Sequence, residues 1–190
     1  MKKTVLIMAV VSLCSVIANA QIVSRDISDP DGCVWKQDDW VTARGTLSAI
    51  ADKPEKSTKN TRTLRITTTY PARTFSYWGC SPENGAIPGN PKKISFWVRI
   101  GGDTKGNGSV LRFVNQKGEG EVTLANGKKV KLEIGYDAKE GSWGYVEKEI
   151  PADWPRPLKF AGVVSSNWGG RNEAKSMTST LDLHDLRLYT

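Results

Sequence analysis

The chain has 190 residues, with 27 lysines and arginines against 20 aspartates and glutamates, which gives a formal net charge of +7 at pH 7. The lysines are spread over the whole chain instead of forming a basic stripe between stacking aromatics, so the charge argues against nucleic-acid binding. This length is usual for one domain and suffices for a substantial hydrophobic core. We expect a single, monomeric domain.

Residues 1–20, MKKTVLIMAVVSLCSVIANA, have the organisation of a secretory signal peptide. Two lysines near the start precede an apolar middle, and the segment ends in the small-residue motif Ala-Asn-Ala. The apolar part is too short for a transmembrane helix. We therefore expect cleavage after Ala20, a secreted or periplasmic location, a mature domain of residues 21–190, and no attachment to a membrane.

Two cysteines remain in the expected mature domain, Cys33 and Cys80, because Cys14 lies in the leader. An even pair of cysteines in an oxidising compartment favours a disulfide. We predict a Cys33–Cys80 bridge, which would stabilise the domain by about 3 to 4 kcal/mol in the chain-entropy model. The alternative is a pair of buried thiols.

After the leader, the sequence lacks long stretches of helical periodicity. It consists of short runs in which apolar and polar residues alternate, separated by Gly, Asn, Asp and Pro. Such runs are typical of antiparallel strands. In chain order, we expect a polar surface loop at 51–61 and strands at 61–70, 72–80, 91–100 and 109–116. The strand at 72–80 would place Phe75 and Tyr77 on its apolar face and Trp78 on the other face.

The second half of the chain contains a hairpin and three more runs of this kind. Asn126-Gly127 within EVTLANGKKVKLEIGYD is the dipeptide of a type I′ hairpin turn. Further strands are expected at 142–150, 157–166 and 178–190. A bulge near His184 and Asp185 would keep all four leucines of the last strand on its inner face. Because so many strands need sheet-on-sheet coverage, we predict an all-β, two-sheet antiparallel β-sandwich of jelly-roll type.

Several predicted strands place large aromatic side chains on their polar face. Trp97 and Arg99 lie opposite the apolar residues of 91–100, and Trp143 and Tyr145 lie opposite those of 142–150. Aromatic platforms flanked by arginine and carboxylates can stack on the apolar faces of sugar rings and bind their hydroxyls. The candidate ligand-binding residues are Trp78, Trp97, Arg99, Trp143, Tyr145 and, in a Gly-rich loop, Trp168.

These tryptophans also have a purely structural interpretation. Large aromatic residues in the middle of a strand are usually buried. The N-terminal segment around Trp35 and Trp40, together with loops, could cover the polar face and turn its tryptophans into a second small core.

Signals for catalysis are weak in this sequence. It contains no G-x-S-x-G or H-E-x-x-H pattern and a single histidine, His184. Glu147 and Glu149 share a strand face about 7 Å apart, a spacing that could suit an inverting glycosidase, although such residues are mostly surface charge. We expect no catalytic centre, and a glycan-active hydrolase or lyase that uses Glu147, Glu149 or His184 is the alternative.

Several stretches resemble a known family: ISFWVRIGGD with GSVLRF, SWGYVEKEIPADWPRPLKFAGVV, and STLDLHDLRLY. They are similar to the galactose-binding-like β-jelly-roll domains that occur as carbohydrate-binding modules in secreted bacterial glycan-degrading proteins. The resemblance covers about residues 91–190 and implies non-catalytic binding of a polysaccharide or oligosaccharide. A laminin-G or concanavalin-like sandwich is the alternative topology, and an adhesion protein that binds another protein is a third functional class.

The resemblance also bears on metal binding. Members of the family often hold a structural calcium with acids from the first and last strands. Asp185 matches the second acid of the closing motif, whereas His184 replaces the first. Asp26 and Asp29 could add oxygen ligands or could serve as turn formers. The resemblance thus implies a calcium site at Asp185, Asp26 and Asp29, and no other cofactor.

Overall fold

The structure, a computed structural model, describes residues 26–103, 107–167 and 172–190. The predicted signal peptide and Trp168 lie outside these residues. Within them, no helix is both long enough and apolar enough to cross a membrane.

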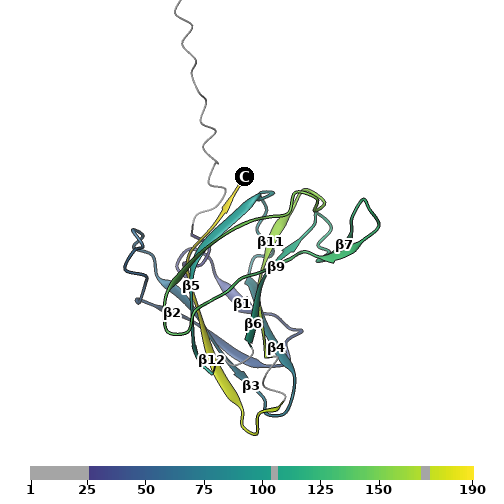
Figure 1. Cartoon of the computed structure of the whole chain (residues 1–190). Coiled ribbons are helices and arrows are strands. Elements are labelled where there is room, and N and C mark those ends of the chain that lie inside the picture. The colour runs from purple at the N-terminus through teal and green to yellow at the C-terminus, as the bar shows by residue number, and fades with distance from the viewer. Residues whose placement is uncertain (1–25, 104–106, 168–171) are drawn as a thin grey trace, which may run out of the picture.

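The described residues form two five-stranded antiparallel sheets that pack face to face (Figure 1). The first, called the β5 sheet, has the order β10 (Gly144–Glu149), β5 (Lys93–Gly102), β12 (Met177–Tyr189), β3 (Thr63–Tyr70) and β2 (Arg44–Ile50). The second, called the β11 sheet, has the order β1 (Trp35–Gln37), β4 (Ser76–Pro82), β11 (Lys159–Asn167), β6 (Asn107–Val114) and β9 (Glu133–Gly135). A separate hairpin consists of β7 (Glu121–Thr123) and β8 (Lys129–Lys131). The predicted all-β, two-sheet sandwich is confirmed.

The core lies between the sheets and follows the predicted alternation on two central strands. On β5, Ile94, Phe96 and Val98 are fully buried. On β12, the register against β5 shifts between His184 and Arg187, which confirms the predicted bulge. The bulge changes the phase of the strand, so all four of its leucines are buried: Leu181, Leu183, Leu186 and Leu188.

Strand β4 has the opposite phase to the one predicted. Trp78 and Cys80 face the core and are almost fully buried, whereas Phe75 is exposed and Tyr77 is half-buried on the outer face. The prediction took Phe75 and Tyr77 as the core-facing pair, although Trp78 and Cys80 form an apolar pair in the opposite phase of the same segment. Since side chains alternate with a period of two, this choice placed every residue of the strand on the wrong face.

Two local features allow the large indole of Trp78 to be buried. Its ring nitrogen Nε1 donates a hydrogen bond to Gln37 Oε1 at 2.9 Å, so the buried polar atom has a partner. On the facing sheet, Gly45 leaves room for the ring, because a Cβ atom there would lie 2.2 Å from Nε1. The prediction that Trp78 binds ligand is therefore wrong.

The predicted hairpin around Asn126-Gly127 exists, but its turn is of a different type. Gly127 N donates to Leu124 O at 2.9 Å, and Gly127 has a φ of 82° while Asn126 does not have a positive φ. A type I turn followed by a left-handed glycine fits these values, whereas a type I′ turn needs positive φ at both central residues. The strand after the turn divides at Leu132, so that β8 pairs with β7 and β9 pairs with β6.

The predicted Cys33–Cys80 disulfide is not formed in the structure. Strand β1 pairs with β4 so that Gln37 lies opposite Cys80, and Cys33 lies four residues before Gln37, outside the strand. The pairing therefore does not place Cys33 opposite Cys80. Burial raises the pKa of the Cys80 thiol well above its usual range, so the side chain is a protonated thiol in the core.

Candidate functional site

Four of the six predicted ligand-binding residues come together in one groove on the outer face of the β5 sheet. Tyr145 on β10 lies directly opposite Trp97 on β5, and their ring centroids are 5.1 Å apart. Tyr145 is 53% exposed and Trp97 is half-buried. The groove, called the β5 groove, has a volume of about 640 Å³ and is lined by residues 52–56, Trp97, Arg99, Ser142, Trp143 and Tyr145.

Arg99 organises this groove rather than presenting a free guanidinium. It donates to the buried carboxylate of Asp182 and, at 2.5 Å, to Asp52 in the loop that walls the groove. Burial alone would lower the pKa of Arg99, but these two ion pairs outweigh it and raise that pKa. The face of the guanidinium lies 4.6 Å from the ring centroid of Trp143, so Arg99 also fixes the position of this indole.

The segment that partly covers this face is the loop at 51–62, not the region around Trp35 and Trp40. Trp35 belongs to the β11 sheet, and Trp40 lines a groove on that side of the molecule. The loop is fastened by the buried His184, whose Nε2 lies 2.8 Å from Ser57 Oγ. The loop therefore covers the middle of the β5 sheet and leaves the groove open beside β10.

The three residues of the enzyme alternative are not gathered in one cleft. His184 is fully buried beneath the loop, and burial lowers its pKa, so the neutral imidazole is favoured. Glu147 and Glu149 are exposed on β10, where Glu147 pairs with Lys93 at 3.4 Å. Neither carboxylate lines the β5 groove.

A second groove lies on the opposite side of the sandwich, on the outer face of the β11 sheet, and one of its walls is aromatic. Tyr77 stacks against Trp40 with ring centroids 5.4 Å apart and lies 6.1 Å from Phe75. Trp40 is 43% exposed and Phe75 is 36% exposed. The indole of Trp40 lies directly on the backbone of Gly79, because a Cβ atom at Gly79 would be 2.7 Å from the ring.

Small side chains on the central strands form the floor of this groove. One row crosses from Gly79 through Val164 and Val110 to Gly135, and Ser166 and Gly108 lie beside it. Arg112, Lys131 and Glu133 also line this groove, and its volume is about 730 Å³. The guanidinium of Arg112 lies 4.8 Å from the ring centroid of Trp40 and is ion-paired with Asp38. We call this site the β11 groove.

The sequence prediction missed this second groove because of the phase error on β4. A useful signal was nevertheless present: Gly79 shares a strand face with Phe75 and Tyr77. A glycine within a strand often marks a place where another group approaches the backbone closely, and here that group is the Trp40 ring.

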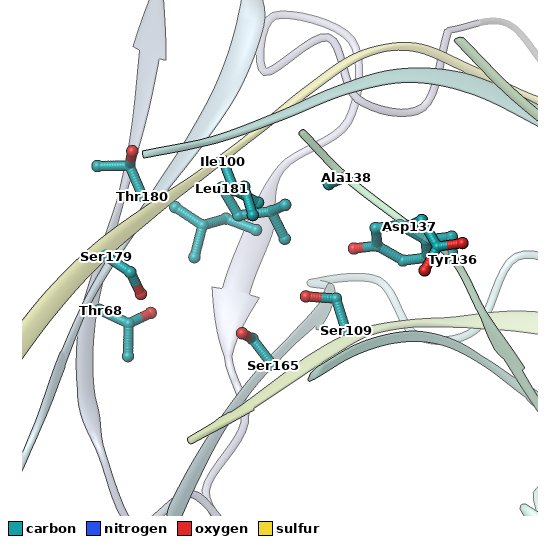
Figure 2. A pocket seen from close by; sticks show the side chains of 11 residues that line it. Thr68, Ile100, Ser109, Tyr136, Asp137, Ala138, Ser165, Ser179, Thr180 and Leu181 are labelled. Atoms are coloured by element: carbon teal, nitrogen blue, oxygen red, sulfur yellow. The ribbon is translucent and has the colours of Figure 1, made fainter. Parts of the chain in front are cut away.

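A pocket between the sheets is lined by both hydroxyl groups and aliphatic side chains and is small (Figure 2). Hydroxyl groups point into it from both sheets and from the segment after β9: Thr68, Ser109, Tyr136, Ser165 and Ser179. Its volume is about 120 Å³, below the roughly 300–1,000 Å³ of typical small-molecule sites, so it has room for a few water molecules. The two outer grooves fall within that range.

The residues predicted to bind calcium are engaged in other ways. The buried Asp26 carboxylate accepts hydrogen bonds from four donors: Ser28 N (2.9 Å), Ser28 Oγ (2.6 Å), Thr61 Oγ1 (2.6 Å) and Leu186 N (3.1 Å). Asp185 pairs with Arg187 at 2.6 Å, and Asp29 Oδ1 accepts from Asp31 N within a turn. The described residues contain no group of three metal-ligating side chains. The predicted set therefore does not fit a calcium site, and Asp26 instead joins the N-terminal segment to the β12 bulge.

Comparison with known proteins bears on the fold. No family model matches the chain, and no curated protein matches it. A solved chain from a study of the promiscuous specificity of carbohydrate-binding modules of the β-sandwich superfamily has a TM-score of 0.51 and 15% identity. The match covers 88% of this chain and 61% of the solved one, so the present chain spans about three fifths of its length.

Two further solved structures match with lower TM-scores. The family 11 carbohydrate-binding module of the cellulase Lic26A-Cel5E of Clostridium thermocellum has a TM-score of 0.47 and 13% identity, over 89% of this chain and 95% of that one. TmCBM61 in complex with β-1,4-galactotriose has a TM-score of 0.44 and 11% identity, over 89% and 98%. Of these three, the first exceeds 0.5, and the comparison of fold rests on it. The chain has the β-sandwich fold found in carbohydrate-binding modules, as the sequence resemblance implied.

Proposed function

We propose that this chain is a secreted, non-catalytic carbohydrate-binding protein and that the β11 groove is its main binding site. The observation that carries the proposal is the aromatic wall of Trp40, Tyr77 and Phe75 beside a floor of small side chains. Sugar rings present apolar C–H faces that pack on such rings, and the shallow floor gives them space to approach.

The dimensions of the β11 groove suit several sugar units rather than one. It crosses from β4 over β11 and β6 to β9, which is three strand spacings, or about 14 Å. Polar groups for hydroxyl recognition lie along it: Ser166, Arg112, Lys131 and Glu133. Arg112 is already held between Asp38 and Trp40, so little side-chain freedom is lost when a ligand binds.

Affinity electrophoresis in gels containing plant, algal or host polysaccharides tests the proposal. The wild-type chain is expected to be retarded by at least one of them. Trp40→Ala should reduce the affinity about tenfold or more, because a large aromatic ring that packs on the ligand is a typical hot spot. Val34→Ala is the matched control, since Val34 is 57% exposed and lines neither outer groove. Normal mobility in every gel would contradict the proposal.

The non-catalytic and secreted parts need separate experiments. Incubation with the retained polysaccharide is expected to release neither new reducing ends nor unsaturated products, and release of either would favour the hydrolase or lyase alternative. The leader-like pattern of residues 1–20 supports secretion. N-terminal sequencing of the exported protein should begin at Gln21, and an intact leader on the exported protein would contradict this part.

A further inference from the structure

We propose that the β5 groove is a second, independent carbohydrate site, so that the chain is bivalent and can link two polysaccharide chains. This inference rests on the proposed function of the β11 groove. The two grooves lie on the outer faces of opposite sheets, with the whole core between them. Because packed sheets are about 10 Å apart, a sugar stacked in one groove cannot touch the other.

The aromatic surface of the β5 groove is open and is fixed in place before any ligand binds. Tyr145 is 53% exposed and is supported from the side by Trp97. Trp143 is held by the guanidinium of Arg99, which is itself clamped by Asp182 and Asp52. Rings that are already immobilised lose little conformational entropy when they bind, which is the condition for efficient stacking.

The balance of charge in the β5 groove indicates a neutral saccharide. Three cations line it: Lys53, Lys56 and Arg99. The carboxylates of Asp52 and Glu55 lie at its wall, and that of Asp182 lies beneath it, where Arg99 and Arg65 share it. With Arg65 counted, four cations face three carboxylates (4 − 3 = +1), and this small excess gives little attraction for an acidic polymer. The ring-lined surface, rather than charge, would select the ligand.

Bivalency has a measurable consequence. When both sites bind one polymer or two neighbouring chains, the second contact benefits from a high effective concentration, and avidity can exceed single-site affinity by about 10²–10⁴. The wild-type chain should therefore bind a long polysaccharide much more tightly than a short oligosaccharide, and it should cross-link the long polysaccharide.

Two single variants and their double mutant separate the sites. The first is Trp40→Ala in the β11 groove, and the second is Tyr145→Ala in the β5 groove. Cellohexaose, xylohexaose and a β-1,4-galacto-oligosaccharide are titrated into each protein by calorimetry. The wild type is expected to bind two oligosaccharides per chain, each single variant one, and the double variant none. Tyr145→Phe keeps the ring and should change the affinity of this site less than about threefold.

Cross-linking gives an independent readout with the parent polysaccharides. The wild type should raise the turbidity of the solution, whereas each single variant should bind without doing so.

The outcomes distinguish the two proposals. If the wild type binds one oligosaccharide per chain, and this binding is lost in Trp40→Ala but unaffected by Tyr145→Ala, the second site is overturned and the proposed function stays intact. Dependence on Tyr145 alone would overturn bivalency and the assignment of the main site together. No binding by the wild type would refute the proposed function itself. Near-ultraviolet circular dichroism confirms that each variant is folded.

Discussion

The two grooves place aromatic rings on opposite faces of one sandwich by different means. In the β11 groove, strand register places Tyr77 on the outer face of β4, and Trp40 contacts both Gly79 and the Arg112 guanidinium. In the β5 groove, strand pairing places Tyr145 beside Trp97, but one wall is a loop that is held through Asp52 and His184. This wall lies outside the sheets and depends on long-range polar contacts. Perturbing those contacts should affect the β5 groove more than the β11 groove.

Asp182→Asn should have the largest effect. The Asp182 carboxylate is buried and is shared by Arg65 and Arg99, so the substitution leaves two partly buried cations with a weaker partner. Loss of one member of a buried ion pair costs about 3–5 kcal/mol, and urea denaturation measures this change in the free energy of unfolding. Asp31→Asn is the control, because Asp31 pairs with Arg62 on the surface and should change stability little. Equal effects of the two substitutions on the free energy of unfolding would contradict the role of Asp182 in holding Arg65 and Arg99.

Gly79→Ala should act on the β11 groove alone. The new methyl group would meet the Trp40 ring at about 2.7 Å and displace it from β4, although every aromatic atom of the wall is still present. Oligosaccharide affinity at this site should fall about tenfold, as for loss of the ring itself, in calorimetric titrations. Gly135→Ala lies in the same row of the floor, where a Cβ atom meets nothing within 4 Å, and it should bind normally.

Lowering the pH should destabilise the folded chain through His184, which holds the loop at the wall of the β5 groove. This effect should be smaller than those of the two substitutions above. Burial lowers the pKa of His184 in the folded chain, while the unfolded chain keeps the ordinary value of about 6.5. Between these values the unfolded state binds more protons, so the free energy of unfolding decreases as the pH falls below about 6.5. His184 is the only histidine, so His184→Gln should remove this part of the pH dependence. If the free energy of unfolding of His184→Gln depended on pH as that of the wild type does, the attribution of this dependence to His184 would be contradicted.

The β5 groove shows what alternation in the sequence can predict. Ile94, Phe96 and Val98 fix the phase of β5, and therefore Trp97 and Arg99 could be placed on the outer face from the sequence alone. That Tyr145 lies beside Trp97 could not be predicted, because strand neighbours are decided by tertiary pairing. A polar surface loop was predicted at 51–61, but its attachment to His184 through Ser57 could not be predicted, because the two residues are 127 positions apart in the chain.

The β11 groove shows where the same reasoning fails. Strand β4 has large aromatics on both faces, so hydrophobicity does not choose between Trp78 and the pair of Phe75 and Tyr77. The choice is made by Gln37 and Gly45, which satisfy and accommodate the Trp78 indole from other strands. Trp40 follows a strand of three residues, too short to give an alternating pattern in the sequence.

Indole N–H signals in ¹H–¹⁵N spectra test the central claim of two carbohydrate-binding faces most directly. On titration with a bound oligosaccharide, the Nε1–H signals of Trp40 and Trp97 should both shift, whereas those of the buried Trp35 and Trp78 should stay in place. Binding that shifts neither Trp40 nor Trp97, or that moves the core indoles instead, would contradict it.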